Sequence, residues 1–348
     1  MPPTRPDSVS VIGAGSWGTA LALLLAHNIA EVRLWGRDRA LLDEIARARC
    51  NRRYLPDAKL PQNISLTPDF DAMVEDSDSL CFVLAVPCHA FRARVEALRD
   101  AIAAAGRASA DATVVWGSKG FEPDSGKLLG EVVAETLGAG AVRAVLSGPS
   151  FAAETARGLP TALTLACDHR AAAQAMADWF RAPATRVYFS DDLIGVQLGG
   201  AIKNVMAIAA GISDGLGFGA NARAALIARG LAELTRLGVA LGGRAETFRG
   251  LAGVGDLVLT CTDDQSRNRR FGLGIGQGRA QAEVRREIGQ EIEGINSARE
   301  LRRASAELGI EMPITEQVYQ VLHRDRDPKL AVQALLQRDA KSEHGESA

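Results

Sequence analysis

Cysteine is scarce in this chain of 348 residues and follows no pattern. Five cysteines, an odd number, are irregularly spaced: Cys50, Cys81, Cys88, Cys167 and Cys261. A disulfide framework or a structural zinc site would need paired cysteines at regular spacing. We therefore expect reduced thiols, a cytoplasmic location and no metal site.

An excess of charge of either sign is also missing. Forty basic residues oppose 42 acidic ones, which gives a formal net charge of −2. Proteins that bind nucleic acids generally carry a basic excess over a whole domain. The balance argues against a nucleic-acid partner.

Long apolar runs are absent from the first part of the chain. The segment "MPPTRPDS" lacks the apolar core of a secretory signal, and "ALALLLA" at 20–26 is too short to span a bilayer. The last ten residues, "DAKSEHGESA", hold little that could pack, so we expect that end to fray. We expect neither export nor a transmembrane segment.

What is present is an alternation of strand-like and helix-like segments over about the first 190 residues. "SVSVIGAGSWGTALALLLAHN" predicts a strand, a glycine turn and a helix, and "AEVRLWGRD" predicts the next strand. Further strands are expected at 80–87, 112–120, 142–150, 160–167 and 185–190, the last two around a helix at 170–181. The alternation predicts an α/β doubly wound sheet.

The pattern changes near Asp192. Apolar residues then recur once per helical turn at Ile194, Leu198, Ile202 and Met206, and the rest of the chain predicts only helices and loops. The length also favours two domains. We place a nucleotide-binding domain at 1–192 and an all-α domain at 193–348.

Gly13, Gly15 and Gly18 form a G-x-G-x-x-G motif between the first strand and its helix. In such a turn the first glycine permits the tight bend, the second lets the backbone approach a pyrophosphate, and the third lets helix and strand pack closely. The helix N-terminus then faces the phosphates. The context predicts a dinucleotide site.

The end of the second strand bears on the choice of cofactor. A carboxylate there binds the ribose hydroxyls of NAD, whereas an arginine accommodates the 2′-phosphate of NADP. The sequence has Gly36, Arg37 and then Asp38 at this point. Arg37 favours NADP, and Asp38 leaves NAD open.

Lys203 lies in an apolar helical segment, one turn after Gly199 and Gly200, which we expect to leave room for a ligand. A desolvated lysine can exchange protons near neutral pH. The alternative is a lysine whose ammonium reaches water. Lys119 and Asp256 are candidate partners that could assist carbonyl reduction.

Ser266, Arg267, Asn268, Arg269 and Arg270 form a dense polar cluster. A solvated loop, a nucleic-acid patch and a pocket for a phosphorylated small molecule are all compatible with it. We favour the phosphate pocket, with the "SRN" segment at 266–268 as its clamp. Arg269 and Arg270 are left without a catalytic role.

Several blocks together closely resemble the bacterial NAD(P)-dependent sn-glycerol-3-phosphate dehydrogenases. They are "GAGSWGTALA", "WGSKGFE", "SGPSFAAE", "GVQLGGAIKNVMAIAAGISDGLGFGANARAALI" and "GDLVLTCTDDQSRNRRFG". The resemblance covers about residues 9 to 335. It implies a Rossmann-type domain, an all-helical C-terminal domain and an active site in the cleft between them.

The resemblance also implies roles for individual residues. Lys203 would be the proton donor and acceptor, with Lys119 and Asp256 as further catalytic residues. The cofactor would be NADP or NAD, bound by Gly13, Gly15, Ser16, Trp17, Gly18, Arg37, Lys119, Ala152, Arg267, Glu291 and Glu293. The substrate would be bound by Lys119, Gly148, Ser150, Lys203, Asp256, Ser266, Arg267 and Asn268.

The resulting expectation is reversible reduction of dihydroxyacetone phosphate to sn-glycerol 3-phosphate, the backbone of phospholipids, by a cytoplasmic homodimer. Two alternatives stay open. One is an NADP-linked reductase of hydroxy or keto acids with the same architecture. The other is a dinucleotide sensor without catalysis, for which a proton donor in an apolar helix would be unnecessary.

Overall fold

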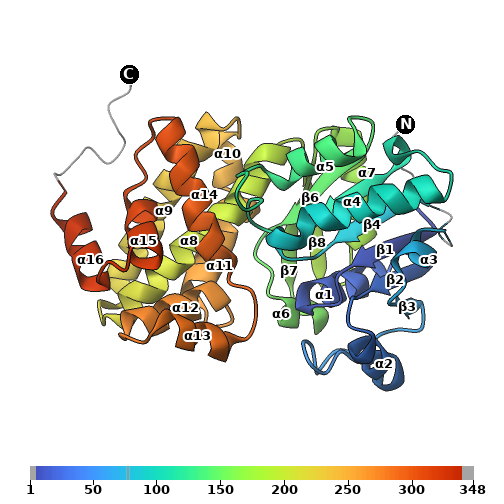
Figure 1. Ribbon diagram of the computed structural model, residues 1–348, viewed down its shortest axis with the longest axis horizontal. Coiled ribbons are helices and arrows are strands. Elements are labelled where there is room, and N and C mark those ends of the chain that lie inside the picture. Colours follow the sequence, from blue (N-terminus) through green and yellow to red (C-terminus); the bar gives the residue numbers. More distant parts are fainter. Residues whose placement is uncertain (1–4, 76, 78, 339–348) are drawn as a thin grey trace.

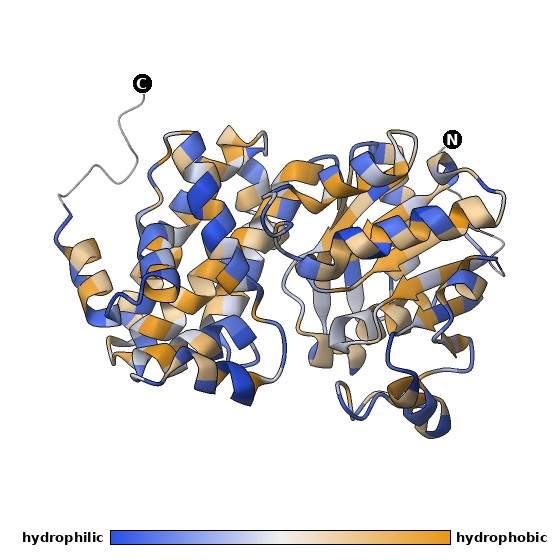
Figure 2. Ribbon diagram, in the orientation of Figure 1, coloured by the Kyte–Doolittle hydropathy of each residue, from blue (hydrophilic) through white to orange (hydrophobic). Residues whose placement is uncertain are grey.

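The computed structural model describes residues 5–75, 77 and 79–338, so the expected fraying of 339–348 falls outside the described residues. Two halves lie side by side in Figure 1, an α/β half and a helical half. The central strands stand out as apolar in Figure 2, in keeping with a sheet that is covered on both faces.

One eight-stranded sheet organises the α/β half, in the order β3-β2-β1-β4-β5-β6-β7-β8. Its strands are β1 (Ser8–Ile12), β2 (Glu31–Trp35), β3 (Ile64–Thr67), β4 (Cys81–Leu84), β5 (Thr113–Trp116), β6 (Val142–Ser147), β7 (Thr161–Cys167) and β8 (Thr185–Ser190). The first six strands are parallel and follow the 3-2-1-4-5-6 order of the doubly wound dinucleotide-binding fold. The predicted fold class is confirmed.

Helices cover both faces of this sheet. The helices of this half are α1 (Ser16–Leu25), α2 (Arg39–Ala48), α3 (Phe70–Glu75), α4 (Cys88–Ala104), α5 (Leu129–Leu137), α6 (Ala152–Ala156) and α7 (Arg170–Ala177), with short 3₁₀ turns at Ser109–Asp111 and Asp178–Phe180. Side chains of α1, α2 and α7 share one apolar core with the sheet, and those of α3, α4 and α5 share another. Such coverage leaves the ends of the strands for ligands.

Two features of the sheet differ from the sequence prediction. β3 was not predicted, because its four residues at the edge of the sheet give too short an alternation to separate from a loop. The other difference is direction: β7 runs antiparallel to β6, and β8 runs parallel to β7. Alternation of strands and helices along the sequence does not specify the direction in which an added edge strand pairs.

The helical half is built around α8 (Leu193–Gly215). The other elements are α9 (Gly219–Ala240), α10 (Ala245–Phe248), a π-helical turn (Leu251–Gly255), α11 (Asp256–Thr262), α12 (Arg267–Gly276), α13 (Gln281–Ile288), α14 (Glu293–Glu307), α15 (Pro313–His323) and α16 (Pro328–Leu336). Asp192 caps α8 by accepting a hydrogen bond from Gly195 N, 2.8 Å from Oδ1. The domain boundary at Asp192 stays a prediction, although β8 ends two residues before this cap.

Within the described residues, α8 is the one helix with the length and hydropathy to cross a membrane, and 94% of its most apolar window is buried inside the protein. Its neighbours approach unusually closely. A Cβ on Gly211 of α8 would lie 2.1 Å from Arg269 O, and one on Gly272 of α12 would lie 2.1 Å from Ile208 O. Only glycine permits this backbone contact between α8 and α12.

Candidate active site

The turn after β1 has the geometry that a pyrophosphate requires. Gly13 has φ +119°, and a Cβ there would lie 2.6 Å from Ala85 O. A Cβ on Gly18 would lie 1.8 Å from Gly13 O, whereas one on Gly15 would meet nothing within 4 Å. No side chain caps the N-terminus of α1, which begins at Ser16. Its backbone N–H groups are thus open to an anion, and the residues present fit a bound dinucleotide.

Trp17 lies beside this turn. Its indole is so close to Gly117, which follows β5, that a Cβ on the glycine would lie 2.4 Å from Trp17 Nε1. Trp17 and Ala152, the first residue of α6, pack against the same small apolar cluster. Trp17 Nε1 is buried and has no hydrogen-bond partner among the described residues. The Trp17 ring therefore packs against Gly117 at the end of β5, and its Nε1–H remains available as a donor.

Arg37 and Asp38 follow β2 and differ in their engagement. Asp38 caps α2, because its Oδ1 accepts a hydrogen bond from Leu41 N at 3.1 Å. Its other oxygen lies 3.8 Å from Arg53 Nη1. The Arg37 side chain is exposed and forms no hydrogen bond or ion pair with the described part of the chain. Asp38 thus has a structural role, and Arg37 has a free guanidinium.

Three predicted catalytic residues meet between the two halves. Asp256, the first residue of α11, accepts from Lys203 Nζ at 2.5 Å through Oδ1 and from Lys119 Nζ at 2.7 Å through Oδ2. Lys203 comes from the middle of α8, and Lys119 follows β5 at the carboxyl end of the sheet. Lys119 Nζ also donates to Gly148 O, after β6, at 3.0 Å. One buried carboxylate therefore holds two ammonium groups at fixed positions.

The surroundings of these groups change their acidity. Burial, together with the positive charge of Lys119, lowers the pKa of Lys203 to about 8, even though Asp256 acts in the opposite direction. Burial alone would raise the pKa of Asp256, but Lys119 and Lys203 hold it below its ordinary value. Lys203 can therefore gain and lose a proton near neutral pH beside a carboxylate that stays ionised. The buried ion pair excludes the alternative of an ammonium in open water.

Gly199 and Gly200 do not leave space for a ligand as the sequence suggested. A Cβ on Gly199 would lie 2.2 Å from Ala252 O in the π-helical turn before Asp256. One on Gly200 would lie 3.0 Å from Ser147 Oγ and 3.3 Å from Lys119 Cγ. The protein itself occupies the room, and the glycines bring α8 close to the segments that carry Lys119 and Asp256.

The "SRN" segment begins α12. Ser266 is its N-cap, with Oγ accepting from Arg269 N at 3.2 Å. Arg267 Nη1 lies 3.4 Å from Gln290 Oε1. Burial lowers the pKa of Arg267, while the negative charges of Glu293 and Glu291 oppose this effect. The segment therefore combines a helix N-terminus with a guanidinium, two features that favour a phosphate.

Asn268 forms hydrogen bonds with protein groups, so its side chain is not simply a free donor for a phosphate. Its Nδ2 donates to Asn204 Oδ1 at 3.0 Å, and its Oδ1 accepts from Gly294 N at 2.9 Å. Ser150 Oγ donates to Gly148 O at 2.9 Å, the same carbonyl that accepts from Lys119. Both predicted substrate residues are held by protein groups around the two lysines.

Glu293 links the two halves. Its Oε1 accepts a hydrogen bond from Cys88 N, the first residue of α4, at 3.0 Å. Burial, reinforced by the charge of Glu291, raises the pKa of Glu293. Glu291 Oε2 lies 3.8 Å from His89 Nδ1. The start of α14 is thereby placed against the carboxyl end of β4, near Lys119 and the "SRN" segment.

Two residues that contact the site were missed in the sequence. Thr260 Oγ1 accepts from Lys203 Nζ at 3.0 Å, and Asn204 Nδ2 donates to Lys119 O at 3.1 Å. A signal for Thr260 was available, because it follows Asp256 by four residues and shares its helix face. Asn204 faces the site although it is adjacent to Lys203 in α8, and the sequence does not fix such a direction.

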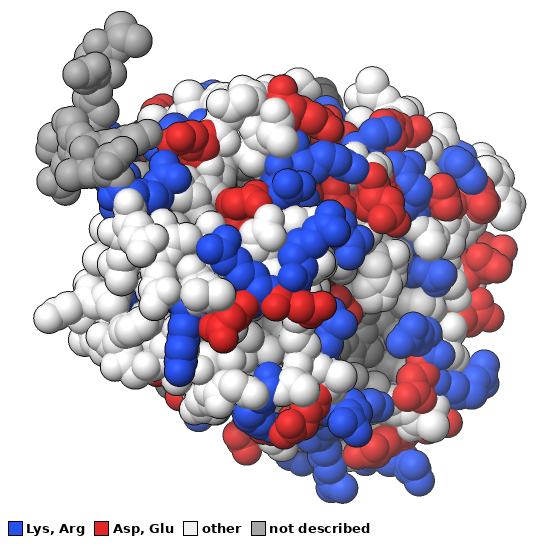
Figure 3. All heavy atoms as spheres, turned by 60° about the vertical axis from the view of Figure 1, so that its left-hand side comes forward, with Lys and Arg blue, Asp and Glu red and all other residues white. Residues whose placement is uncertain are grey.

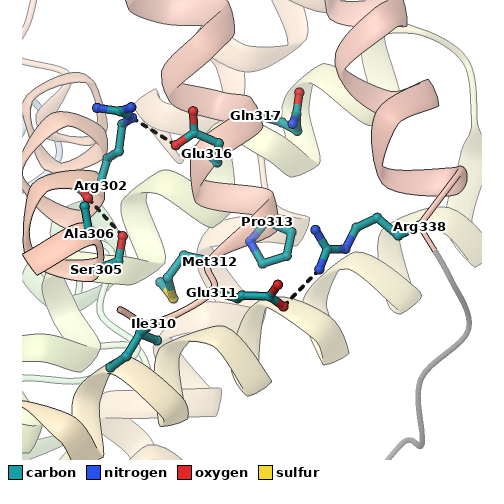
Figure 4. Close-up of a pocket in the computed structure, with 10 residues that line it drawn as sticks. All are labelled: Arg302, Ser305, Ala306, Ile310, Glu311, Met312, Pro313, Glu316, Gln317 and Arg338. Atoms are coloured by element: carbon teal, nitrogen blue, oxygen red, sulfur yellow. Dashed lines mark hydrogen bonds and ion pairs between the residues drawn. The ribbon is translucent and has the colours of Figure 1, made fainter. Parts of the chain in front are cut away.

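A hollow elsewhere in the protein is lined by none of the site residues described above. A hollow of about 280 Å³ between α14, α15 and the end of α16 is lined by Arg302, Ser305, Ala306, Ile310, Glu311, Met312, Pro313, Glu316, Gln317 and Arg338 (Figure 4). Its arginines pair with Glu316 and Glu311. On the face in Figure 3, basic and acidic side chains are interspersed. Within the described ranges, no cluster of three or more His, Cys, Asp or Glu residues could hold a metal ion.

Comparisons with known proteins agree with this architecture. The model of the NAD-dependent glycerol-3-phosphate dehydrogenase N-terminus matches residues 8–173, and that of the C-terminus matches residues 192–333. The glycerol-3-phosphate dehydrogenase (NAD(P)+) of Thioalkalivibrio sulfidiphilus is 55% identical over 339 residues, which cover 96% of this chain and 98% of that protein. The enzyme of that name from Methylococcus capsulatus is 52% identical, with 96% and 98% coverage.

A solved structure shows the same fold over nearly the whole chain. The crystal structure of glycerol-3-phosphate dehydrogenase from Coxiella burnetii has 45% sequence identity and a TM-score of 0.89, and the match covers 96% of this chain and all of that one. Family models that together span most of the chain and relatives above 50% identity lead to one conclusion. The chain belongs to the NAD-dependent glycerol-3-phosphate dehydrogenase family.

Proposed function

We propose that this protein is an NAD(P)-dependent oxidoreductase that reduces dihydroxyacetone phosphate to sn-glycerol 3-phosphate and catalyses the reverse oxidation. The observation that carries the proposal is the shared carboxylate of Asp256, which holds Lys203 at 2.5 Å and Lys119 at 2.7 Å. Carbonyl reduction needs a proton donor at the carbonyl oxygen, and these groups supply one.

The chain's residues divide the task between them. In the reductive direction Lys203 donates the proton to the substrate oxygen, and in oxidation it accepts that proton. Lys119 adds a second positive charge, which stabilises negative charge on the same oxygen. Asp256 keeps both ammonium groups in place. The bound nicotinamide supplies the hydride chemistry, and the residues of the β1 turn hold the dinucleotide.

Arg267 and the N-terminus of α12 would hold the phosphate of the substrate. The guanidinium offers charge-assisted hydrogen bonds, and the first N–H groups of the helix add neutral ones. A phosphate held at one end fixes the distance between the carbonyl and Lys203. This contact would separate a three-carbon phosphate from unphosphorylated ketones.

NADPH is the cofactor that Arg37 favours. Its exposed guanidinium has no partner in the described chain, whereas Asp38 already caps α2. We propose that Arg37 binds the 2′-phosphate and that NADH is also accepted. A cytoplasmic location and a homodimer are further parts of the proposal. Cell fractionation tests the location, and sedimentation tests the oligomeric state.

The decisive experiment is steady-state oxidation of NADPH and NADH with dihydroxyacetone phosphate as the sole acceptor. We expect turnover with both cofactors and far lower rates with 2-keto acids. Faster turnover of the keto acids would replace the proposal with a hydroxy-acid dehydrogenase. Tight NADPH binding without turnover of either substrate class would indicate a dinucleotide sensor.

A further inference from the structure

Arg269 lies two residues after Arg267 but faces the opposite way, into the protein. It is a buried arginine, with 7% of its surface exposed. Burying a guanidinium is unfavourable unless its donors are satisfied. The proposed reaction gives Arg269 no part, so the reason for its burial has to be found in what it joins.

The guanidinium of Arg269 contacts three separate segments. Nε donates to Cys261 O, at the end of α11, at 3.1 Å. Nη2 pairs with Asp214 Oδ2, near the end of α8, at 2.6 Å. Nη1 pairs with Asp264, in the loop between α11 and α12. One side chain thus ties α8, α11 and the intervening loop to the first turn of α12.

Each of these segments carries part of the candidate site. Helix α8 carries Lys203, α11 begins with Asp256, and the loop ends at Ser266, the N-cap of α12. The backbone of α12 also packs against α8, since a Cβ on Gly211 would lie 2.1 Å from Arg269 O and one on Gly272 would lie 2.1 Å from Ile208 O. The side chain of Arg269 links Asp264, in the loop before α12, to α8 through Asp214 and to α11 through Cys261 O.

We propose that Arg269 is a positioning residue that sets the distance between the phosphate-binding "SRN" segment and the proton-transfer group Lys203. The inference rests on the proposed function, because it assumes that this segment binds the substrate phosphate. A clamp that shifts by a fraction of an ångström still binds phosphate, but it presents the carbonyl wrongly to Lys203. Arg269 therefore acts on the reaction of the phosphorylated substrate without touching it.

The test compares two substrates in each variant: dihydroxyacetone phosphate and unphosphorylated dihydroxyacetone. We expect Arg269→Gln to lower kcat/KM for the phosphorylated substrate by roughly 10- to 100-fold and to change that for dihydroxyacetone by less than about threefold. A general loss of folded enzyme would lower both values by the same factor. Equal losses would overturn the proposal.

Matched variants separate the possible causes. Arg223→Ala removes the other arginine that pairs with Asp214 Oδ2, at 2.9 Å, and Arg270→Ala removes an exposed neighbour. Both should leave the ratio of the two kcat/KM values unchanged. Arg269→Lys should restore part of the ratio, because a lysine can keep one of the three links. A ratio in Arg223→Ala as low as in Arg269→Gln would assign the effect to Asp214 and overturn the role of Arg269.

Two further variants, Asp264→Ala and Arg267→Ala, test the proposal even if Arg269→Gln does not fold. Asp264 is exposed, so Asp264→Ala should fold even if Arg269→Gln does not, and the proposal requires a smaller fall in the same ratio. An unchanged ratio there, with Arg269→Gln unfolded, counts against the proposal. Arg267→Ala reports on the clamp itself: if it leaves the ratio unchanged, the proposed phosphate site fails. If only Arg267→Ala lowers the ratio, the clamp stands and the positioning role fails.

Discussion

Gly15, in the turn after β1, and the glycines in the contact between α8 and α12 have different surroundings. A Cβ on Gly15 would meet nothing within 4 Å, next to a helix N-terminus that no side chain caps. A Cβ on Gly211 would lie 2.1 Å from the backbone oxygen of Arg269. The first region keeps backbone donors open for a ligand, and the second closes two helices onto each other.

The polar groups of the two regions follow the same division. The N–H groups at the start of α1 have no side-chain cap, whereas Lys203, Lys119 and Asp256 pair with one another in the helical half and at its border. Binding groups can be left open to water at little cost. Proton-transfer groups need a desolvated position with a fixed partner, since that position sets their pKa.

The largest expected effect concerns Lys203, the proposed proton-transfer group in the helical half. Lys203→Ala should lower kcat for dihydroxyacetone phosphate about 10² to 10⁴-fold, the usual contribution of a general acid or base. NADPH binding, measured by fluorescence titration, should stay close to the wild-type value because the β1 turn is untouched. Near-normal turnover at saturating substrate would make Lys203 a packing residue.

A pair of glycine variants tests the comparison directly. Gly211→Ala should lower the free energy of unfolding by roughly 1–3 kcal/mol, because the added methyl group meets backbone that cannot move aside. Gly15→Ala should cost less than about 1 kcal/mol, since its site is open, but should raise the Kd for NADPH. Thermal unfolding and cofactor titration of both proteins supply the data. Equal destabilisation by the two changes would abolish the distinction.

Cofactor preference tests Arg37, which lies on the dinucleotide-binding side of the comparison. Arg37→Ala should weaken NADPH binding roughly tenfold or more, the value of a charge-assisted contact, and leave NADH binding nearly unchanged. NADH serves as the internal control because it lacks the 2′-phosphate. Equal losses for the two cofactors would remove Arg37 from the proposed contact.

The sequence predicts the open region better than the closed one, for a physical reason. The β1 turn, with Gly13 and Gly18, lies within a few residues of chain, so local spacing determines its geometry. Lys119 and Asp256 are 137 residues apart, and only the folded chain brings them together. The sequence offered them as candidate partners of Lys203 for carbonyl reduction, and the resemblance to a family placed them in one site.

The same reason explains what was misjudged. From the sequence alone, Gly199 and Gly200 fit two interpretations, a space for a ligand or a close contact of the helix. Only the position of the neighbouring segment decides between them. The burial of Arg269 could not be separated from the exposure of Arg270, since both belong to one charged run. Short β3 has too few residues for its period to be recognised. The first two depend on which segments pack together in the folded chain, and the third on the length of the strand.

The remaining prediction needs no substitution: a pH dependence of the reaction that comes from Lys203 and its buried surroundings. Burial lowers the pKa of Lys203 to about 8 from the ordinary 10.5. Reduction needs the protonated ammonium, which is present below that pKa and lost above it.

Accordingly, kcat/KM for dihydroxyacetone phosphate should be level up to about pH 8 and then fall about tenfold per pH unit, while kcat/KM for oxidation of sn-glycerol 3-phosphate rises up to the same point. Asp256 stays ionised throughout, since its pKa is held below the ordinary value. The profile should therefore show one inflection in this range, and Lys203→Ala should lose it. An inflection near 10.5 would mean that burial does not tune this lysine, and the closed region would then differ from the open one in packing but not in acidity.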